Sequence, residues 1–237
     1  MFENNIPSPS AFDQLDQAVA IERKQRTPEW YAARRGRFTG SEVHKLMTDP
    51  RSKADKDAGK LSDGAMTYIY QVLAEKTTGI TPEVFSHAMQ WGIDHEEEAK
   101  EVYKTFFGET INESDFIAWG QHGGGSTDGE IGEDGIAEIK CPFNSGVHLE
   151  NLAFAFSMPS GEAFKEQYKE YYWQIQNNLM VTGRKFCRFI SYDPRFNGQA
   201  KISCVTVQRS ETDIAELRGR IERAAVVMMQ IKERANI

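Results

Sequence analysis

The order of hydrophobic patterns along the chain constrains its fold most strongly, because the spacing switches from helical to strand-like and back again. Helical spacing dominates before Gly108, short strand-like segments with glycine turns follow up to Pro142, and helical spacing then returns. This alternation predicts a mixed α/β (α+β) fold with a central mixed β-sheet flanked by helices. The predicted helices begin at Pro28 and Ser41, cover 62–79, 86–107 and 164–183 and begin again at Ser210, and the predicted strands cover 116–119, 126 onward, 136–141, 185–191 and 201–207.

Capping and turn residues set the expected element boundaries. Thr27 and Ser62 are suited to cap helix N-termini, and Gly79 and Gly183 are suited to end helices. The apolar groups of the 86–107 helix do not form one stripe, which allows a break near its middle. Composition predicts a surface loop over 51–62, a turn over 120–125, a hairpin turn over 132–135 and a long loop after Pro142.

Length and composition favour one globular domain. The 237 residues are 40% hydrophobic and 27% charged, so we expect a single domain over 1–237, with residues 1–20 as a loose N-terminal arm. No apolar run reaches the roughly 18 residues of a membrane span, and the first residues lack the regions of a secretory signal. Three widely spaced cysteines form neither a disulfide framework nor a CxxC pair. These features are typical of a reduced, cytoplasmic protein.

The charge distribution bears on nucleic-acid binding. A net charge of −7 argues against a protein that coats DNA by charge alone, but it does not exclude an enzyme whose carboxylates hold metal ions. Ten Lys and Arg residues also fall between positions 23 and 56. That basic stretch is compatible with a local nucleic-acid contact, although an ordinary solvated surface has the same composition.

The strongest indication of a site is Asp128, followed ten positions later by Glu138 and then by Lys140. Two strands joined by a tight glycine turn can set the two acids side by side, and residues i and i+2 of a strand share a face. Two carboxylates can hold a hard cation, and a nearby ammonium can orient its water, help to deprotonate it or offset developing negative charge. Phosphodiester hydrolysis needs this combination of groups.

The spacing alone also allows a solvent-facing hairpin with a cross-strand ion pair, worth under about 1 kcal/mol. The alternation of side chains favours a site slightly. Ala137, Ile139 and Cys141 occupy one face of the strand, so we expect the face of Glu138 and Lys140 to border a cleft or solvent.

Seven motifs in the same order resemble the phage lambda exonuclease family, the YqaJ-type viral recombinase nucleases of the PD-(D/E)xK superfamily. The resemblance spans roughly residues 28–230, and Thr127 stands where the superfamily name expects a proline. The matching pieces are Trp30 to Arg34 with Gly36; Thr39 to His44; Trp91-Gly92 with Glu96; Ser126 to Gly129; Glu138 to Phe143; Gln174-Ile175-Gln176; and Tyr192 to Arg195.

The resemblance implies a single nuclease domain with a restriction-endonuclease-like core. It implies a Mg²⁺-dependent exonuclease that binds a double-stranded DNA end with a 5′-phosphate, degrades the 5′-ended strand and leaves a 3′ overhang. Two Mg²⁺ ions per site are implied, with Mn²⁺ as the alternative cation. The implied partners are two further copies in a homotrimeric ring and a single-strand annealing protein. The implied setting is the cytoplasm of a bacterial cell, with a phage or prophage origin.

The same resemblance implies roles for individual residues. Asp128, Glu138 and the Ile139 carbonyl are implied metal ligands, and Lys140 is the implied group that activates the water. Glu96 is implied as a further acid near the metals, and Gln174 as a residue near the active centre. The implied pocket for the 5′-phosphate and the DNA end consists of Arg34, Thr39, Ser41 and Trp30. An arginine fork and a serine at a helix N-terminus suit a phosphate group.

Taken singly, each of these residues has an ordinary structural alternative. Glu96 and Arg34 could be solvated surface residues, Trp30 a core aromatic, and Gln174 a helix-packing side chain. For the whole protein, a sequence-specific endonuclease and a non-catalytic DNA-end or partner-binding module are the competing functions. An endonuclease would cut covalently closed circular DNA, which an exonuclease leaves intact. A non-catalytic module would show no strand loss at any divalent-cation concentration.

Overall fold

The computed structural model of the protein describes residues 18–21, 25–82 and 85–237. Helices and strands alternate along it. The mixed α/β class predicted from the sequence is confirmed. The helices are α1 (Pro28–Arg34), α2 (Lys53–Asp57), α3 (Asp63–Thr78), α4 (His87–Phe107), α5 (Ser145–Phe156), α6 (Gly161–Gln167), α7 (Lys169–Thr182) and α8 (Glu211–Ala235), with 3₁₀ turns η3 (Val43–Met47) and η4 (Gly198–Lys201). The strands are β1 (Ala18–Ile21), β2 (Phe38–Thr39), β3 (Ile111–Asn112), β4 (Phe116–Trp119), β5 (Gly123–Gly125), β6 (Gly129–Ile131), β7 (Gly135–Lys140), β8 (Phe186–Tyr192) and β9 (Ile202–Gln208).

The strands fall into two sheets rather than the single central sheet expected. One sheet has the order β1-β4-β5-β2 and the other the order β3-β6-β7-β8-β9. Each contains one parallel pair, β2 with β5 and β7 with β8, while its other pairs are antiparallel. Both sheets are therefore mixed. The parallel neighbours β7 and β8 are joined through helices α5, α6 and α7, as a parallel connection requires.

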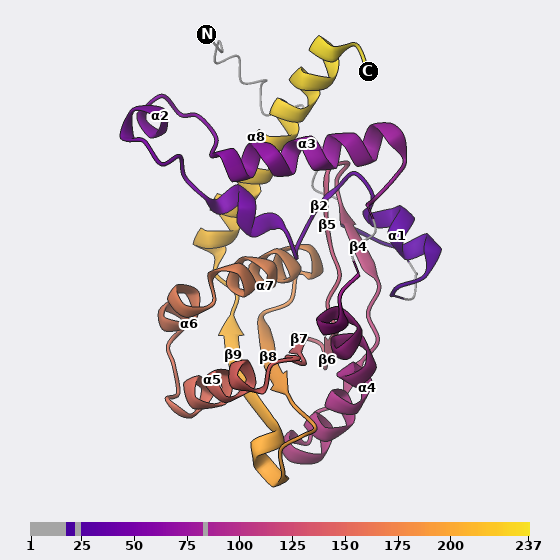
Figure 1. Cartoon of the computed structure of the whole chain (residues 1–237), viewed down its shortest axis with the longest axis vertical. Coiled ribbons are helices and arrows are strands. Elements are labelled where there is room, and N and C mark those ends of the chain that lie inside the picture. The colour runs from indigo at the N-terminus through magenta and orange to yellow at the C-terminus, as the bar shows by residue number, and fades with distance from the viewer. Residues whose placement is uncertain (1–17, 22–24, 83–84) are drawn as a thin grey trace.

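Both faces of the five-stranded sheet are covered by helices. Ile136 and Phe189 face a core shared with α7 and α8, whereas Ala137 and Ile139 face a second core shared with α4. Figure 1 shows α4 on one side of β7 and β8, with α5 and α6 on the other. It also shows α3 crossing the long helix α8, against which it packs. No helix in the described part of the chain has the length and apolar character needed to cross a membrane.

The helices begin and end largely at the capping residues that the sequence predicts. The side-chain oxygens of Thr27, Ser62 and Ser210 accept hydrogen bonds from the first-turn N–H groups of α1, α3 and α8. Gly79 and Gly183 end α3 and α7 with positive φ, a conformation that costs glycine little. The hairpin turn predicted over 132–135 is also present, with β6 and β7 antiparallel on either side of it.

Several boundary expectations were wrong. The triple glycine of the expected 120–125 turn forms strand β5, which pairs with β4 and β2. Glycine is needed there because a side chain at Gly124 would collide with Phe116 of the neighbouring strand. Helix α4 runs without a break over its 21 residues. The expected 51–62 loop contains α2, capped by Ser52. In the expected long loop after Pro142, Asn144 caps the 12-residue helix α5.

Two further expectations concern the chain between 160 and 183 and the N-terminal arm. The helix expected over 164–183 is divided at Tyr168, whose φ of −124° and ψ of 51° interrupt the ladder between α6 and α7. Of the loose arm expected over 1–20, residues 18–20 belong to strand β1, which pairs with β4. Residues 1–17 lie outside the described part of the chain.

Candidate active site

Two carboxylates oppose each other where β6 begins and β7 ends. Gly129 pairs with Ala137 in the antiparallel register, and one further residue in that register sets Asp128 against Glu138. The Asp128 N–H donates to the Ala137 carbonyl at 3.1 Å. Asp128 Oδ2 in turn accepts from the Ile139 N–H at 2.6 Å. The hairpin therefore places the two acids side by side, as their spacing in the sequence predicted.

Glu138 receives two donors on one oxygen and none on the other. Lys140 Nζ lies 2.7 Å from Glu138 Oε1, and Gln174 Nε2 on α7 donates to the same oxygen at 2.6 Å. Glu138 Oε2 is buried and has no hydrogen-bond partner among the described residues. A buried, unpaired carboxylate oxygen is costly, so its geometry suits a cation that would bind there.

The expectation that the face of Glu138 borders a cleft or solvent was wrong for Glu138 itself. Its side chain is 1% exposed and shares its face with Ile136, beneath the helices that cover this side of the sheet. The opening lies at Asp128 instead. Asp128 lines a pocket of about 100 Å³ together with Glu96 and Arg26.

The charges of these groups depend on one another. Burial and then the neighbouring Glu138 carboxylate raise the pKa of Asp128 to about 6. Burial disfavours the charge on Lys140, but the carboxylates of Glu138 and Asp128 outweigh it and raise the pKa of the ammonium. Lys140 is therefore a cation here, and its ammonium also lies 4.8 Å from the centre of the Tyr171 ring.

Of the three consecutive glutamates on α4, Glu96 is the one beside Asp128. It is 8% exposed, and burial followed by the Asp128 charge raises its pKa. The Glu97 side chain is 80% exposed and pairs with Lys100 at 2.7 Å. Glu98 pairs with His95 on the same helix. The structure thus brings the buried Glu96 beside Asp128, while Glu97, whose side chain is exposed, also lines the pocket and Glu98 does not.

Arg26 is a neighbour of this pocket that the sequence analysis did not assign. Its guanidinium forms an ion pair with Glu96, and its charge opposes the increase in the pKa of Asp128. Arg26 and Glu96 are 70 positions apart, so no local pattern could have joined them.

The side chains around Asp128 and Glu138 could supply only part of the ligand set of a divalent cation. Within residues 18–21, 25–82 and 85–237, no three His, Cys, Asp or Glu side chains group closely enough to hold a metal. A cation at Asp128 and Glu138 would therefore need backbone carbonyl, water or substrate oxygens as well. The two carboxylates, the unpaired Glu138 Oε2 and the raised pKa of Asp128 all suit a hard, oxygen-ligated cation.

Two of the residues expected to hold the DNA end, Arg34 and Trp30, contact each other. Arg34 Nη2 lies 3.4 Å from Ser41 Oγ, and the Arg34 guanidinium stacks on Trp30 at 4.2 Å from the ring centre. Trp30 Nε1 donates to Ser126 Oγ at 3.3 Å, two residues before Asp128. Trp30 therefore connects the Arg34 guanidinium to the segment that carries Asp128.

Thr39 and Ser41 differ from their expected local structure. Ser41 was expected to open a helix, but it lies in a turn, and the short 3₁₀ segment η3 begins at Val43 after an N-cap at Glu42. A phosphate at this place would therefore meet the Ser41 hydroxyl rather than a helix N-terminus. Thr39 is 7% exposed, and its N–H donates to the Tyr68 hydroxyl at 2.9 Å.

Helix α7 also contributes two asparagines that the sequence analysis passed over. Asn177 Nδ2 donates to the Gly124 carbonyl and Asn178 Nδ2 to the Ser126 carbonyl, each at 3.1 Å. A side chain on Gly125 would lie 2.6 Å from Asn178 Oδ1, so glycine permits this close approach. The adjacent Gln-x-Gln motif is the only local signal that this helix approaches the site.

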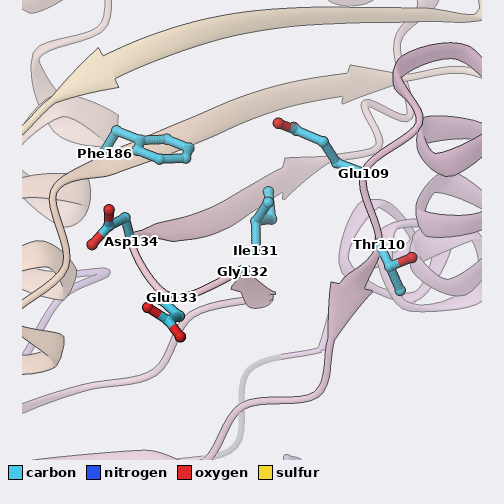
Figure 2. Close-up of a pocket in the computed structure, with 7 residues that line it drawn as sticks. All are labelled: Glu109, Thr110, Ile131, Gly132, Glu133, Asp134 and Phe186. Carbon is cyan, nitrogen blue, oxygen red and sulfur yellow. The ribbon is translucent and has the colours of Figure 1, made fainter.

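A larger pocket, of about 350 Å³, lies at the opposite end of β7. Figure 2 shows Glu133 and Asp134 on the turn between β6 and β7, with Phe186 and Glu109 on other walls. Neither Glu138 nor Lys140 lines this pocket, and one of its carboxylates, Glu109, already pairs with Arg188 at 2.9 Å. We therefore place the candidate active site at Asp128 and Glu138.

Known structures resemble this arrangement along most of the chain. An alkaline exonuclease (LHK-Exo) from Laribacter hongkongensis matches with a TM-score of 0.74 and 28% identity, covering 89% of this chain and 96% of that one. Its complex with dAMP matches with a TM-score of 0.72 and 29% identity, covering 89% and 98%. A phage related exonuclease from Haemophilus somnus 129PT shares the fold at 19% identity, with a TM-score of 0.69 and coverage of 84% and 96%.

Comparison with the curated proteins gives no match. A family model does match, over residues 29–185. That range contains the opposed acids, Lys140, Gln174 and the Arg34 region. The chain therefore belongs to the family of the YqaJ-like viral recombinase domain.

Proposed function

We propose that this protein is a Mg²⁺-dependent exonuclease that digests the 5′-ended strand of duplex DNA from an end and leaves a 3′ single-stranded overhang. The observation that carries the proposal is the opposition of Asp128 and Glu138, with the Lys140 ammonium 2.7 Å from Glu138. Family membership and the likeness to an alkaline exonuclease support the same class of reaction.

In this proposal Asp128, Glu138 and the Ile139 carbonyl hold two Mg²⁺ ions, and Mn²⁺ is the alternative cation. Bound divalent ions would supply a water nucleophile at neutral pH and neutralise charge on the phosphodiester. Glu138 Oε2 has no other partner among the described residues, which supports its assignment as a ligand. Glu96 lines the pocket beside Asp128 and is proposed as a further acid near the metals.

Lys140 and Gln174 are proposed to neutralise charge in the transition state and to orient Glu138. Lys140 is a cation in the structure, which favours stabilisation of negative charge in the transition state over acceptance of a proton. Gln174 donates to Glu138 Oε1 and so orients the carboxylate from the α7 side. Orientation of a ligand by a hydrogen-bonded neighbour is a common requirement of metal sites.

Arg34 and Ser41 are proposed to hold the 5′-phosphate at the DNA end. The guanidinium is fixed against Trp30, which leaves its fork able to grip phosphate oxygens in two places. Thr39 lies beneath this region, and Trp30 connects it to Ser126. A phosphate bound there would set the scissile bond close to Asp128.

The test uses linear duplex DNA labelled separately at each end, incubated with and without Mg²⁺. The expected result is loss of the 5′ label as mononucleotide, retention of the 3′-ended strand, and no reaction without the cation. Covalently closed circular duplex should remain intact. Cleavage of the circle would identify an endonuclease, and no strand loss at any Mg²⁺ or Mn²⁺ concentration would identify a non-catalytic module.

The wider setting follows the same proposal. We expect residues 1–237 to act as a single nuclease domain, to assemble as a homotrimeric ring around DNA, and to work with a single-strand annealing protein in the cytoplasm of a bacterial cell. Light scattering after size-exclusion chromatography measures the oligomeric state directly. A monomer at micromolar concentration would contradict the ring.

A further inference from the structure

The guanidinium of Arg195 makes contacts to three separate parts of the chain. Arg195 Nε donates to Asp193 Oδ1 at 2.7 Å, and Nη2 donates to Asp193 Oδ2 at 2.8 Å. Nη1 donates to the Phe143 carbonyl and Nη2 to the Pro142 carbonyl, each at 3.0 Å. The guanidinium also lies 4.5 Å from the centre of the Trp91 ring.

These contacts join the ends of two parallel strands. Pro142 follows Lys140 by two positions, at the end of β7, and Asp193 directly follows the last residue of β8. Lys140 lies opposite Ser191 in the parallel register, so the arginine holds the chain just beyond that pair. Asp193 is 0% exposed, so the carboxylate that anchors the guanidinium is itself fixed.

The third contact reaches the helix that carries Glu96. Trp91 lies on α4, five residues before Glu96, and its ring also packs against Phe143 and His95 at 5.9 and 4.0 Å. One guanidinium therefore connects the strand of Glu138 and Lys140 to the helix of Glu96.

We propose that Arg195 is a positioning residue, which fixes the spacing between the β7 groups, Glu138 and Lys140, and the α4 carboxylate of Glu96. The inference rests on the proposed function, because that spacing matters only if the three groups share a reaction. Arg195 touches none of the candidate ligands and acts through the backbone and Trp91. A lysine retains the charge, but its three donors on one nitrogen cannot reproduce the four hydrogen bonds of the guanidinium or its planar contact with Trp91.

The chain offers a matched control at the other end of the same strand. Arg184 Nη1 donates to the Gly132 and Gly135 carbonyls at 2.8 and 3.0 Å, and Nη2 pairs with Glu130. Arg184 is thus a second arginine that holds two backbone carbonyls and one carboxylate, but it does so at the hairpin turn, away from Lys140. Arg184→Lys reports the stability cost of losing such a fork without disturbing the spacing at the site.

The experiment compares wild type, Arg195→Lys and Arg184→Lys. Three quantities are measured: Mn²⁺ affinity without DNA by electron paramagnetic resonance, the rate of digestion, and affinity for a duplex end in EDTA. We expect Arg195→Lys to weaken Mn²⁺ binding by about tenfold and digestion by about 10- to 100-fold, with end affinity within about twofold. Arg184→Lys should lower Tm and leave all three quantities within about twofold of wild type.

Trp91→Leu is the second variant, because it removes the α4 contact and leaves the arginine in place. It should weaken Mn²⁺ binding and digestion together while preserving end affinity. The inference is overturned if Arg195→Lys and Arg184→Lys have the same Mn²⁺ affinity and digestion rate, or if Trp91→Leu binds Mn²⁺ as tightly as wild type. In either case an active wild-type protein still supports the proposed function. A wild-type protein that neither binds Mn²⁺ nor digests DNA overturns both.

Discussion

Gln174 on α7 donates a 2.6 Å hydrogen bond to Glu138 Oε1 on β7, so the helix above the sheet orients a carboxylate within it. Gln176 follows two positions later, about 200° around the helix, and has a different task. Its Nε2 donates to the Gln208 carbonyl and its Oε1 accepts from the Ser210 N–H, which joins α7 to the start of α8. Two glutamines in one short motif thus separate into a site contact and a core contact.

This division predicts opposite consequences for two similar substitutions. Gln174→Ala should lower the rate of digestion by about tenfold with little change in Tm, because it frees Glu138 to reorient. Gln176→Ala should lower the free energy of unfolding by about 1–3 kcal/mol, because it leaves buried backbone groups unpaired, and should spare the rate. Initial rates and thermal melts of both variants test the pair, and a reversed or identical pattern would contradict it.

Lys140→Ala should reduce Mg²⁺-dependent digestion by about two to three orders of magnitude while duplex-end binding survives. That is the usual consequence, about 3–4 kcal/mol, of losing one well-placed group that stabilises the transition state. Lys185→Ala removes an exposed lysine that pairs with Asp134 at the far end of the sheet, and it should digest at the normal rate. A Lys140→Ala enzyme as fast as this control would remove Lys140 from the reaction.

Arg34→Ala should narrow the preference for 5′-phosphorylated over 5′-hydroxyl duplex ends. The guanidinium is held by Trp30 and Ser41, so its charge is available at one fixed place. Arg35 is the exposed neighbour at the end of the same helix, and Arg35→Ala controls for the loss of one positive charge. Digestion rates on the two kinds of end give the ratio, and an unchanged ratio in Arg34→Ala would exclude it from the phosphate contact.

Much of the fold could be predicted from the sequence because local residues determine where its helices begin and end. Ser62 and Ser210 cap helices whose apolar positions repeat regularly, and such elements need no distant partner to be recognised. Strand β5 was missed because three glycines carry no strand propensity, and only the packing of Phe116 and α7 against them explains the strand. Helix α5 was missed because its N-cap, Asn144, lies in a segment whose composition is typical of loops.

The candidate site likewise contains contacts that local sequence predicts and contacts that it does not. The opposition of Asp128 and Glu138 follows from a tight turn, so the spacing of the two residues predicted it. The Arg34 and Gln174 positions came from the family resemblance, since no local pattern marks them. The contacts of Arg26 with Glu96 and of Arg195 with Pro142 cross 70 and 53 positions, and only the folded chain reveals them.

Divalent ions should stabilise the folded protein through the opposed acids. Without a cation, burial and then the neighbouring Glu138 carboxylate disfavour the charge on Asp128 and raise its pKa to about 6. At a hundredfold excess over its Kd, an ion adds about 2.7 kcal/mol to the free energy of unfolding. Mg²⁺ should therefore raise Tm in wild type but not in Asp128→Asn. Glu133→Gln alters the other acidic pocket and should retain the response, whereas a response kept in Asp128→Asn and lost in Glu133→Gln would point to that pocket instead.

Acid sensitivity is expected at His122, in the turn between β4 and β5, six positions before Asp128. Burial, followed by the charges of Lys76 and Arg37, lowers the pKa of His122 to about 4, and Lys76 Nζ lies 3.4 Å from its Nδ1. The His122 carbonyl accepts from the Phe38 N–H at 2.7 Å, so the turn that carries it is tied to β2. Protonating the ring would place a third positive charge in this cluster.

The sign of the effect follows from proton uptake. Below the ordinary histidine pKa of 6.5 the unfolded chain binds a proton that the folded chain does not, so stability falls as the pH decreases from 6.5 to about 4. After allowance for solvent screening, the loss from this residue is on the order of 1–2 kcal/mol. His122→Gln should flatten the pH dependence in that range, and His87→Gln, at an exposed position, should not. Urea unfolding at pH 7 and pH 4.5 measures both, and parallel losses in wild type and His122→Gln would show that the acid sensitivity comes from other groups.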